Sequence, residues 1–353
     1  MKPYDLYDRV LGCLVTAGMG DAIGAPAEAM SRAEIQEKYG GRIETFVDGS
    51  DNEYALGNEI AEVTDDASQM YEMAKAVVST GGDLTIDAAA AAIIRWSQSY
   101  PKYYPRNAGP TTSHVIGELL AGKDPVQTGK VGLVYGRGTS NGAAMRVAGA
   151  GLAHPGDYEK AIETAVTMCM PSHGTQHAYA GACAIACGIS EAMTQEADVY
   201  STLSACLYGA RRGEQIGLQT ARIATGANVE QCILRAIGAA LEATDMPDAE
   251  RRIERAVGND GSIQSSVSAA CGLFAAANAD PAATILGGAN IGGDTDTIAC
   301  IAGMLSGALR GFSALPAKWP PVFCRANPSL DFEGLARAFT EMIRARNLSK
   351  KDV

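Results

Sequence analysis

The chain has 353 residues, of which 40 are acidic and 29 basic, so its formal net charge is −11. This excess of negative charge argues against general affinity for nucleic acid or anionic membranes, and we expect neither as a partner. Hydrophobic residues make up 47% of the chain and aromatic residues only 6%, a balance that favours closely packed helices over a β-sandwich.

The nine cysteines are typical of reduced thiols. Their number is odd, most lie in apolar stretches, and none forms a CxxC pair, so we interpret them as small core residues. The first residues do not resemble the start of a signal peptide, and no uninterrupted apolar segment is long enough to cross a bilayer. We therefore expect a cytoplasmic protein.

Apolar residues recur at helical spacing along nearly the whole chain. In chain order, this spacing predicts helices around residues 6–15, 70–78, 88–96, 161–168, 177–193, 229–241, 265–277, 297–309 and 332–343. Residues 42–47 are the best candidate for a strand, and loops are expected at 40–63, 100–112, 122–142 and 312–330. The pattern predicts an all-α fold, a compact orthogonal bundle of roughly a dozen helices.

Two short acidic clusters lie almost at opposite ends of the chain. Thr64-Asp65-Asp66 opens one predicted helix, and Asp294-Thr295-Asp296-Thr297 opens another, directly after Gly292-Gly293. One explanation is that both clusters are helix caps, with Thr64 and either Asp294 or Thr295 as the N-cap. The other is that they meet and bind a divalent cation, because oxygen ligands without His or Cys suit Mg²⁺, Mn²⁺ or Ca²⁺ better than zinc.

The chain contains no Ser/Gly/Pro-rich linker and no fixed-period repeat. If the two clusters meet, a boundary near residue 150 would place them in different units. We therefore predict a single domain over residues 1–353.

Three further segments contain residues capable of chemistry. In 18–28, frequent glycines suit close helix crossing, and the end of the helix can deliver Glu28 to a cleft. Residues 136–146 form a Gly/Ser/Asn-rich loop before a helix, which can cradle a phosphate or be an ordinary loop with an Asn-Gly turn. In 171–177, His173 and His177 are four residues apart, but no third zinc ligand follows a suitable pattern, so a role in capping or lining a pocket is favoured.

In this order, the segments resemble the ADP-ribosylglycohydrolase family, whose members include the dinitrogenase reductase-activating glycohydrolase and the ADP-ribosyl-acceptor hydrolases. The resemblance runs from Gly12 to Arg310. It rests on GDAIGAPAE at 20–28, TDD at 64–66, SNGAAMR at 140–146, SH at 172–173 and GGDTDT at 292–297. It implies an all-α domain with two Mg²⁺ ions, with Mn²⁺ as the alternative.

The resemblance also implies roles for individual residues. The implied metal ligands are Thr64, Asp65, Asp66, Asp294, Asp296 and Thr297. The catalytic carboxylates expected are Glu28, as a gate or acid beside the scissile bond, with Asp65, Asp294 and Asp296, and our candidate base is an aspartate of the second cluster. The substrate-binding residues expected are Ser140, Asn141, Gly142 and His173, with Tyr135 as a candidate for stacking.

The activity expected is that of a binuclear Mg²⁺-dependent glycohydrolase that cleaves at the anomeric carbon of a ribosyl group, foremost in ADP-ribosyl conjugates. The alternatives are a nucleoside N-ribohydrolase acting on small ribosides, a two-metal phosphohydrolase, and a non-catalytic crystallin-like binding or structural relative. The substrate is a small molecule or an ADP-ribosylated partner. Residues 43–63 and Tyr100, Tyr103 and Tyr104 are expected to shape the rim of the cleft.

Overall fold

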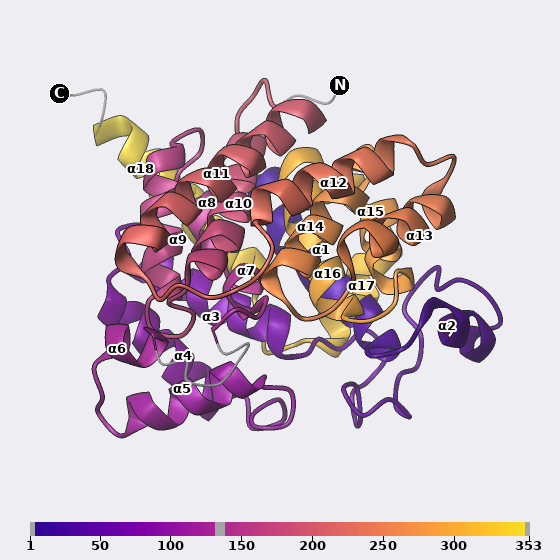
Figure 1. Cartoon of the computed structure of the whole chain (residues 1–353), viewed down its shortest axis with the longest axis horizontal. Coiled ribbons are helices and arrows are strands. Elements are labelled where there is room, and N and C mark those ends of the chain that lie inside the picture. The colour runs from indigo at the N-terminus through magenta and orange to yellow at the C-terminus, as the bar shows by residue number, and fades with distance from the viewer. Residues whose placement is uncertain (1–3, 131–137, 350–353) are drawn as a thin grey trace.

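The computed structural model describes residues 4–130 and 138–349. Within these ranges it contains eighteen α-helices and two short 3₁₀-helices, with two isolated β-bridges and no strand (Figure 1). The prediction of an all-α fold is confirmed.

Many of the described helices are joined by short connections, whereas α2 and α3 are joined by the long segment 40–64. Their bounds are α1 (Leu6–Gly24), η1 (Ala25–Ala27), α2 (Arg32–Tyr39), α3 (Asp65–Ser79), α4 (Ile86–Ser99), α5 (Pro110–Leu120), α6 (Pro125–Lys130), α7 (Gly142–Met145), α8 (Ala148–Leu152), α9 (Tyr158–Cys169), α10 (Gln176–Ala192), α11 (Val199–Thr220), α12 (Val229–Leu241), α13 (Met246–Val257), α14 (Ile263–Ala276), α15 (Pro281–Asn290), α16 (Thr295–Arg310), η2 (Phe312–Ala314), α17 (Trp319–Ala326) and α18 (Phe332–Ser349).

All nine predicted helices form, but half of the helices in the described residues were not predicted. These are α2, α5, α6, α7, α8, α11, α13, α15 and α17. Four of them, α5, α6, α7 and α17, begin inside expected loops. Both α5 and α17 carry proline in their first turn. Proline is compatible with that position because the first N–H groups of a helix have no partner within the helix.

The strand considered at residues 42–47 does not form. The side chain of Asn290, at the end of α15, accepts a hydrogen bond from the Ile43 N–H and donates one to the Ile43 carbonyl, both at 2.9 Å. The side-chain amide of Asn290 therefore satisfies both backbone groups of Ile43, which in a sheet would pair with a neighbouring strand.

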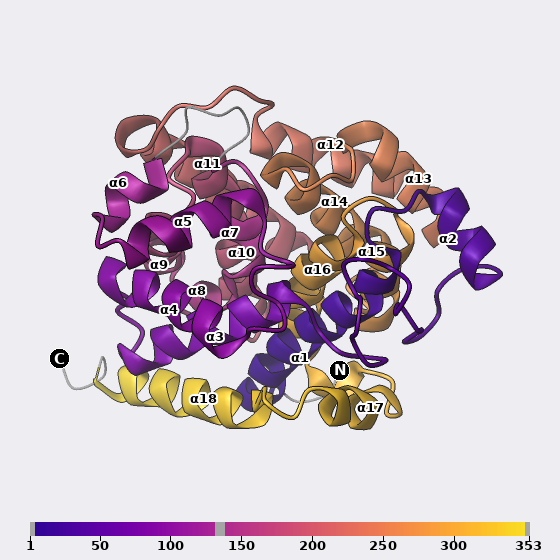
Figure 2. The same ribbon diagram turned by 90° about the horizontal axis from the view of Figure 1, so that it is seen from below.

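Helices α1 and α16, from opposite ends of the sequence, pack against each other in the core (Figures 1 and 2). Their backbones approach so closely that a Cβ on Gly12 would lie 2.5 Å from the Gly307 carbonyl oxygen, and one on Gly303 would lie 2.6 Å from the Thr16 carbonyl oxygen. This contact brings the segment after α1, which carries Glu28, beside the start of α16.

No apolar segment long enough to cross a bilayer was expected, but the first helix meets that length and composition. By length and composition alone, Leu6–Ala27 is sufficient to cross a membrane, but its apolar window is entirely buried inside the protein. Core helices of soluble proteins pass the same test, so this single helix is weak evidence for a membrane span. Eight of the nine cysteines are also buried, and all nine are free thiols.

Candidate metal centre

The two acidic clusters meet at the N-terminal ends of α3 and α16. The hydroxyl of Thr297 donates a hydrogen bond to Oδ2 of Asp66 at 3.0 Å, although 231 residues separate them along the chain. The contact between α1 and α16 brings Glu28 to the same place. The expected meeting of the clusters therefore occurs, and metal binding by them stays a prediction.

Neither cluster works as an ordinary helix cap. Thr64 and Asp294 occupy the N-cap positions of α3 and α16, yet neither side chain accepts an N–H from its own helix. For α3, the acceptor is Asp21 of α1, whose carboxylate binds the Thr64 N–H at 3.0 Å, the Thr64 hydroxyl at 2.9 Å and the Ala67 N–H at 2.8 Å. The aspartates of the first cluster therefore have no part in capping.

Two groups of three carboxylates share one member. In each group, an oxygen from every residue lies within 4.8 Å of the others, and the groups are Asp21, Asp66 and Asp296, and Glu28, Asp294 and Asp296. Asp296 therefore lies between the two groups. Asp65 is in neither of these groups, and it accepts a hydrogen bond from Gln69 at 2.8 Å.

These carboxylates are electrostatically strained. Burial, followed by the neighbouring charge of Asp296, raises the pKa of Asp294 and of Asp21 to about 7. The same two causes raise the pKa values of Glu28, Asp65 and Asp66 well above their ordinary range. In the absence of a cation, the cluster can relieve this repulsion by taking up protons.

The cluster faces a cavity of about 240 Å³. The described residues that line this cavity include no Lys, Arg or His. The lining consists of Glu28, Tyr54, Asp65, Asp66, Asn107, Gly109, Pro110, Thr112, Ser140, Asn141, Gly142, Met145, Gly261, Asp294, Asp296 and Thr297. One carboxylate oxygen, Oε2 of Glu28, is buried without a hydrogen-bond partner. Several carboxylates and hydroxyls around a cavity without a basic side chain fit hard divalent cations.

The loop before α7 lines this cavity beside the second acidic cluster. The Asn141 N–H donates to the Gly261 carbonyl at 3.0 Å, and the Asn141 side-chain amide donates to Asp294 Oδ2 at 2.6 Å and to the Ser266 hydroxyl at 2.8 Å. Asn141 thus holds a carboxylate of the second cluster in place. The predicted stacking residue Tyr135 lies outside the described residues.

The family model for ADP-ribosylglycohydrolases matches residues 2–347. The chain belongs to the ADP-ribosylglycohydrolase family. This membership places it among hydrolases that act on glycosyl compounds and supports ADP-ribosyl hydrolase activity in the broad sense.

Relatives of the chain match it over most of its length or over part of it. The uncharacterised protein YegU of Escherichia coli K12 is 30% identical over 342 residues, which is 96% of this chain and 98% of YegU. The human ADP-ribosylhydrolase ARH3 is 25% identical over 330 residues, or 88% of each chain. The ADP-ribosyl-[dinitrogen reductase] glycohydrolase of Rhodospirillum rubrum is 30% identical over 158 residues, which cover 44% of this chain and 48% of that enzyme.

A solved structure shows the same fold. A chain described as an ADP-ribosylglycohydrolase-related protein complex superposes with a TM-score of 0.65 at 23% identity, covering 96% of this chain and 99% of the other. The ADP-ribosylglycohydrolase-like architecture predicted from the sequence is thereby confirmed.

His173 was expected to line the substrate pocket of this ADP-ribosylglycohydrolase, but its side chain lies behind the pocket wall. The residue is fully buried, and its Nε2 lies 2.9 Å from the hydroxyl of Ser140, which does line the cavity together with Gly142. His173 therefore does not line the cavity, and its Nε2 contacts Ser140, which does.

The rim of the cavity differs in part from the expectation. Tyr54, from the segment 43–63, does line it, and Asn107 donates to the Tyr54 carbonyl at 2.7 Å. The tyrosines expected there do not line it, because the Tyr103 hydroxyl donates to Glu62 at 3.0 Å and the Tyr104 ring packs edge-on against Trp96. Asp21 lies in the motif at 20–28 and Tyr54 in the segment expected at the rim, but neither was singled out as a site residue, and no motif pointed to Asn107.

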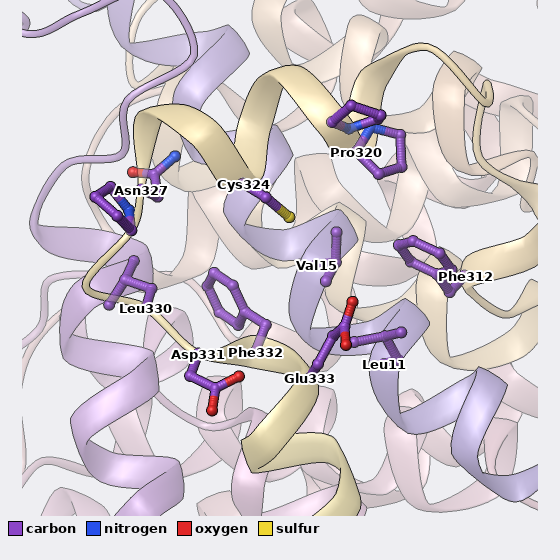
Figure 3. A pocket seen from close by; sticks show the side chains of 12 residues that line it. Leu11, Val15, Phe312, Pro320, Cys324, Asn327, Leu330, Asp331, Phe332 and Glu333 are labelled. Carbon is purple, nitrogen blue, oxygen red and sulfur yellow. The ribbon is translucent and has the colours of Figure 1, made fainter.

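A second, larger hollow of about 540 Å³ lies apart from the carboxylates, between α1, η2, α17 and the start of α18 (Figure 3). Its walls are mainly apolar and include Leu11, Val15, Phe312 and Phe332. None of the residues of the two carboxylate groups lines it. The smaller acidic cavity is therefore the candidate active site of this ADP-ribosylglycohydrolase.

Proposed function

We propose that the protein is a Mg²⁺-dependent ADP-ribosyl hydrolase that binds two ions and cleaves the bond at the anomeric carbon of an ADP-ribosyl conjugate. Mn²⁺ is the proposed substitute ion. The observation that carries this proposal is the convergence of Glu28, Asp66, Asp294 and Asp296 on one cavity whose described lining contains no basic side chain. Family membership and the similarity to the ADP-ribosylhydrolases ARH3 support the ADP-ribosyl part.

The proposed ligands are those predicted from the sequence: Thr64, Asp65, Asp66, Asp294, Asp296 and Thr297. The membership of Asp296 in both carboxylate groups supports a shared ligand between two ions. When bound, such ions polarise sugar oxygens and make a water easier to deprotonate.

The carboxylates of the chain have separate proposed roles. Breaking a bond at the anomeric carbon builds positive charge on the ribose ring, and nearby carboxylates stabilise that charge. Oε2 of Glu28 is buried beside the cavity without a hydrogen-bond partner, so Glu28 is our candidate to exchange a proton with the leaving group. Asp294, held by the Asn141 amide, is our candidate base for the attacking water.

The size of the cavity supports binding of the ribosyl end of the substrate. At about 240 Å³ it is smaller than the roughly 300–1,000 Å³ typical of pockets for drug-sized ligands. We therefore propose that the scissile ribose enters the cavity and that the remainder of an ADP-ribosyl group lies outside it.

The experiment that tests this function is NMR-monitored hydrolysis with Mg²⁺ or with EDTA. The panel contains ADP-ribosyl-arginine, ADP-ribosyl-serine, O-acetyl-ADP-ribose and plain nucleosides. We expect free ADP-ribose from at least one conjugate, in the Mg²⁺ samples alone. Cleavage of nucleosides only, release of phosphate, or no turnover of any compound would contradict the proposal.

A further inference from the structure

One buried arginine lies between the metal cluster and the substrate loop. Among the described residues, Arg146 is the one Lys or Arg in the buried class, with 3% of its surface exposed. Its Nε donates to the Gly142 carbonyl at 2.7 Å, its Nη1 to Gln69 at 3.1 Å and its Nη2 to the Ser172 hydroxyl at 3.1 Å. Such a network fixes the geometry of every group that it joins.

The first branch of the network reaches a predicted metal ligand. A guanidinium can only donate hydrogen bonds, so Gln69 must turn its oxygen toward Arg146. Its amide nitrogen then faces Asp65 and donates to Oδ2 at 2.8 Å. Arg146 therefore fixes the orientation of the Gln69 amide, so that its nitrogen donates to Asp65.

The second branch reaches the wall of the cavity. Nδ1 of His173 lies 2.8 Å from the Ser172 hydroxyl and 3.0 Å from Nη2 of Arg146. A guanidinium can only donate and a hydroxyl can donate as well as accept, so we assign Nδ1 as the unprotonated acceptor and place the ring proton on Nε2. Burial, followed by the charge of Arg146, lowers the pKa of His173 well below its ordinary value, which keeps the ring neutral.

The fixed tautomer has a consequence for Ser140. The Nε2–H of His173 donates to the Ser140 hydroxyl oxygen across 2.9 Å. The hydroxyl proton of Ser140 therefore takes no part in the hydrogen bond to His173. Ser140 also lines the cavity. It is therefore available to donate to an acceptor oxygen of a bound substrate.

We propose that Arg146 is a positioning residue that couples the metal ligand Asp65 to the loop around Ser140. Through His173, it makes Ser140 a hydrogen-bond donor to an acceptor oxygen of the substrate. The parts that concern substrate and metal binding rest on the proposed function, whereas the tautomer of His173 does not depend on it.

The tautomer is tested by ¹⁵N NMR of the four histidines, with His173→Asn used to assign the signals. We expect His173 to be neutral and protonated on Nε2 at neutral pH. A proton on Nδ1, or an imidazolium, would overturn the proposal whether or not the protein has any activity.

The coupling is tested by Gln69→Met, with Gln176→Met as its matched control. Both glutamines are buried, and both amide ends of Gln176 bind Ala224 instead of Arg146. By calorimetry, Mg²⁺ affinity should fall about 10–100-fold in Gln69→Met and stay unchanged in Gln176→Met, as expected for partners of metal ligands. Equal affinities in the two variants would contradict the coupling.

The donor role of Ser140 is tested by Ser140→Ala. We expect KM for a hydrolysed conjugate to rise about 5–10-fold with little change in kcat, as for loss of one hydrogen bond. An unchanged KM in Ser140→Ala would show that Ser140 does not donate a hydrogen bond to the substrate. If the wild-type protein hydrolyses nothing, the proposed function fails, while the NMR and Mg²⁺ results still decide the coupling.

Discussion

Asp21 accepts hydrogen bonds from both the backbone N–H and the hydroxyl of Thr64, which lies 43 residues later in the chain. The carboxylate of one helix thereby caps another helix. It also fixes the position of α3 relative to α1, and with it the first acidic cluster relative to the second.

Replacing this cap should affect both stability and the site. Asp21→Ala leaves the Thr64 and Ala67 N–H groups without an acceptor, so unfolding should become easier by about 1–3 kcal/mol. Urea denaturation measures this change, and calorimetry should show weakened Mg²⁺ binding. Asp280→Ala removes an ordinary cap, that of α15, and should leave Mg²⁺ binding unchanged. Normal Mg²⁺ binding by Asp21→Ala would show that the cap has no influence on the cluster.

Gly24 is required by the close approach of α1 to α16. A Cβ at this position would lie 2.5 Å from the Cα of Asp296, so Gly24→Ala has to displace the backbone that carries the shared ligand. We expect a loss of about 1–3 kcal/mol in stability and a large loss of hydrolysis. In Gly238→Ala, where the new methyl meets nothing within 4 Å, the protein should be stabilised by about 0.5–1 kcal/mol. Similar behaviour of the two variants would contradict this packing.

Without metal, stability should fall as pH rises. The pKa of Asp294 is about 7 in the folded protein, against about 3.9 in an unfolded chain. Between about pH 4 and 7 the folded state therefore binds more protons than the unfolded state, and the free energy of unfolding decreases with pH. Calorimetric scans in EDTA should show Tm falling across this range.

Mg²⁺ and the substitution Asp294→Asn provide the controls for that pH dependence. A bound cation compensates the charged carboxylates, so saturating Mg²⁺ should flatten the fall in Tm. Asp294→Asn should reduce the slope in EDTA because it removes one of the titrating groups. A Tm in EDTA that rises or stays level from pH 4 to 7 would argue against the crowded cluster.

Glu28→Gln should separate activity from stability. The buried Oε2 has no hydrogen-bond partner, so neutralising the side chain relieves repulsion without breaking a contact. We expect kcat to fall about 10²–10⁴-fold, as for loss of a proton-transfer group, with Tm unchanged or raised. Glu34→Gln, in the exposed capping box of α2, should leave kcat unaltered. Full kcat in Glu28→Gln would exclude Glu28 from proton transfer.

The fold class and the position of the acidic clusters could be predicted because both depend on local patterns. Apolar residues at helical spacing identified most of the long buried helices, although α11 was missed. Gly292 and Gly293 form the turn before Asp294, with left-handed φ values of 82° and 70°. The helix α7 is too short for a periodic pattern, and α13 is mostly polar, although its few apolar residues share one face. The prolines in the first turns of α5 and α17 resemble loop signals.

Contacts between distant segments could not be predicted from such patterns. The cap provided by Asp21, the rim residues Tyr54 and Asn107, and the place of His173 behind Ser140 all depend on how helices pack. The family resemblance supplied residue roles but no side-chain directions, which is why His173 was expected in the pocket itself.

The most direct test of the central claim compares Asp296→Asn with the wild-type protein for Mg²⁺ binding and for hydrolysis of the ADP-ribosyl panel. Asp296 belongs to both carboxylate groups, whereas Asp87→Asn changes an exposed aspartate in the first turn of α4 and serves as the control. We predict that both the Mg²⁺ affinity and the hydrolysis rate of Asp296→Asn fall more than about 100-fold. This loss exceeds the effect typical of a residue that only hydrogen-bonds to a metal ligand. Intact hydrolysis by Asp296→Asn with added Mg²⁺ would contradict the shared metal site.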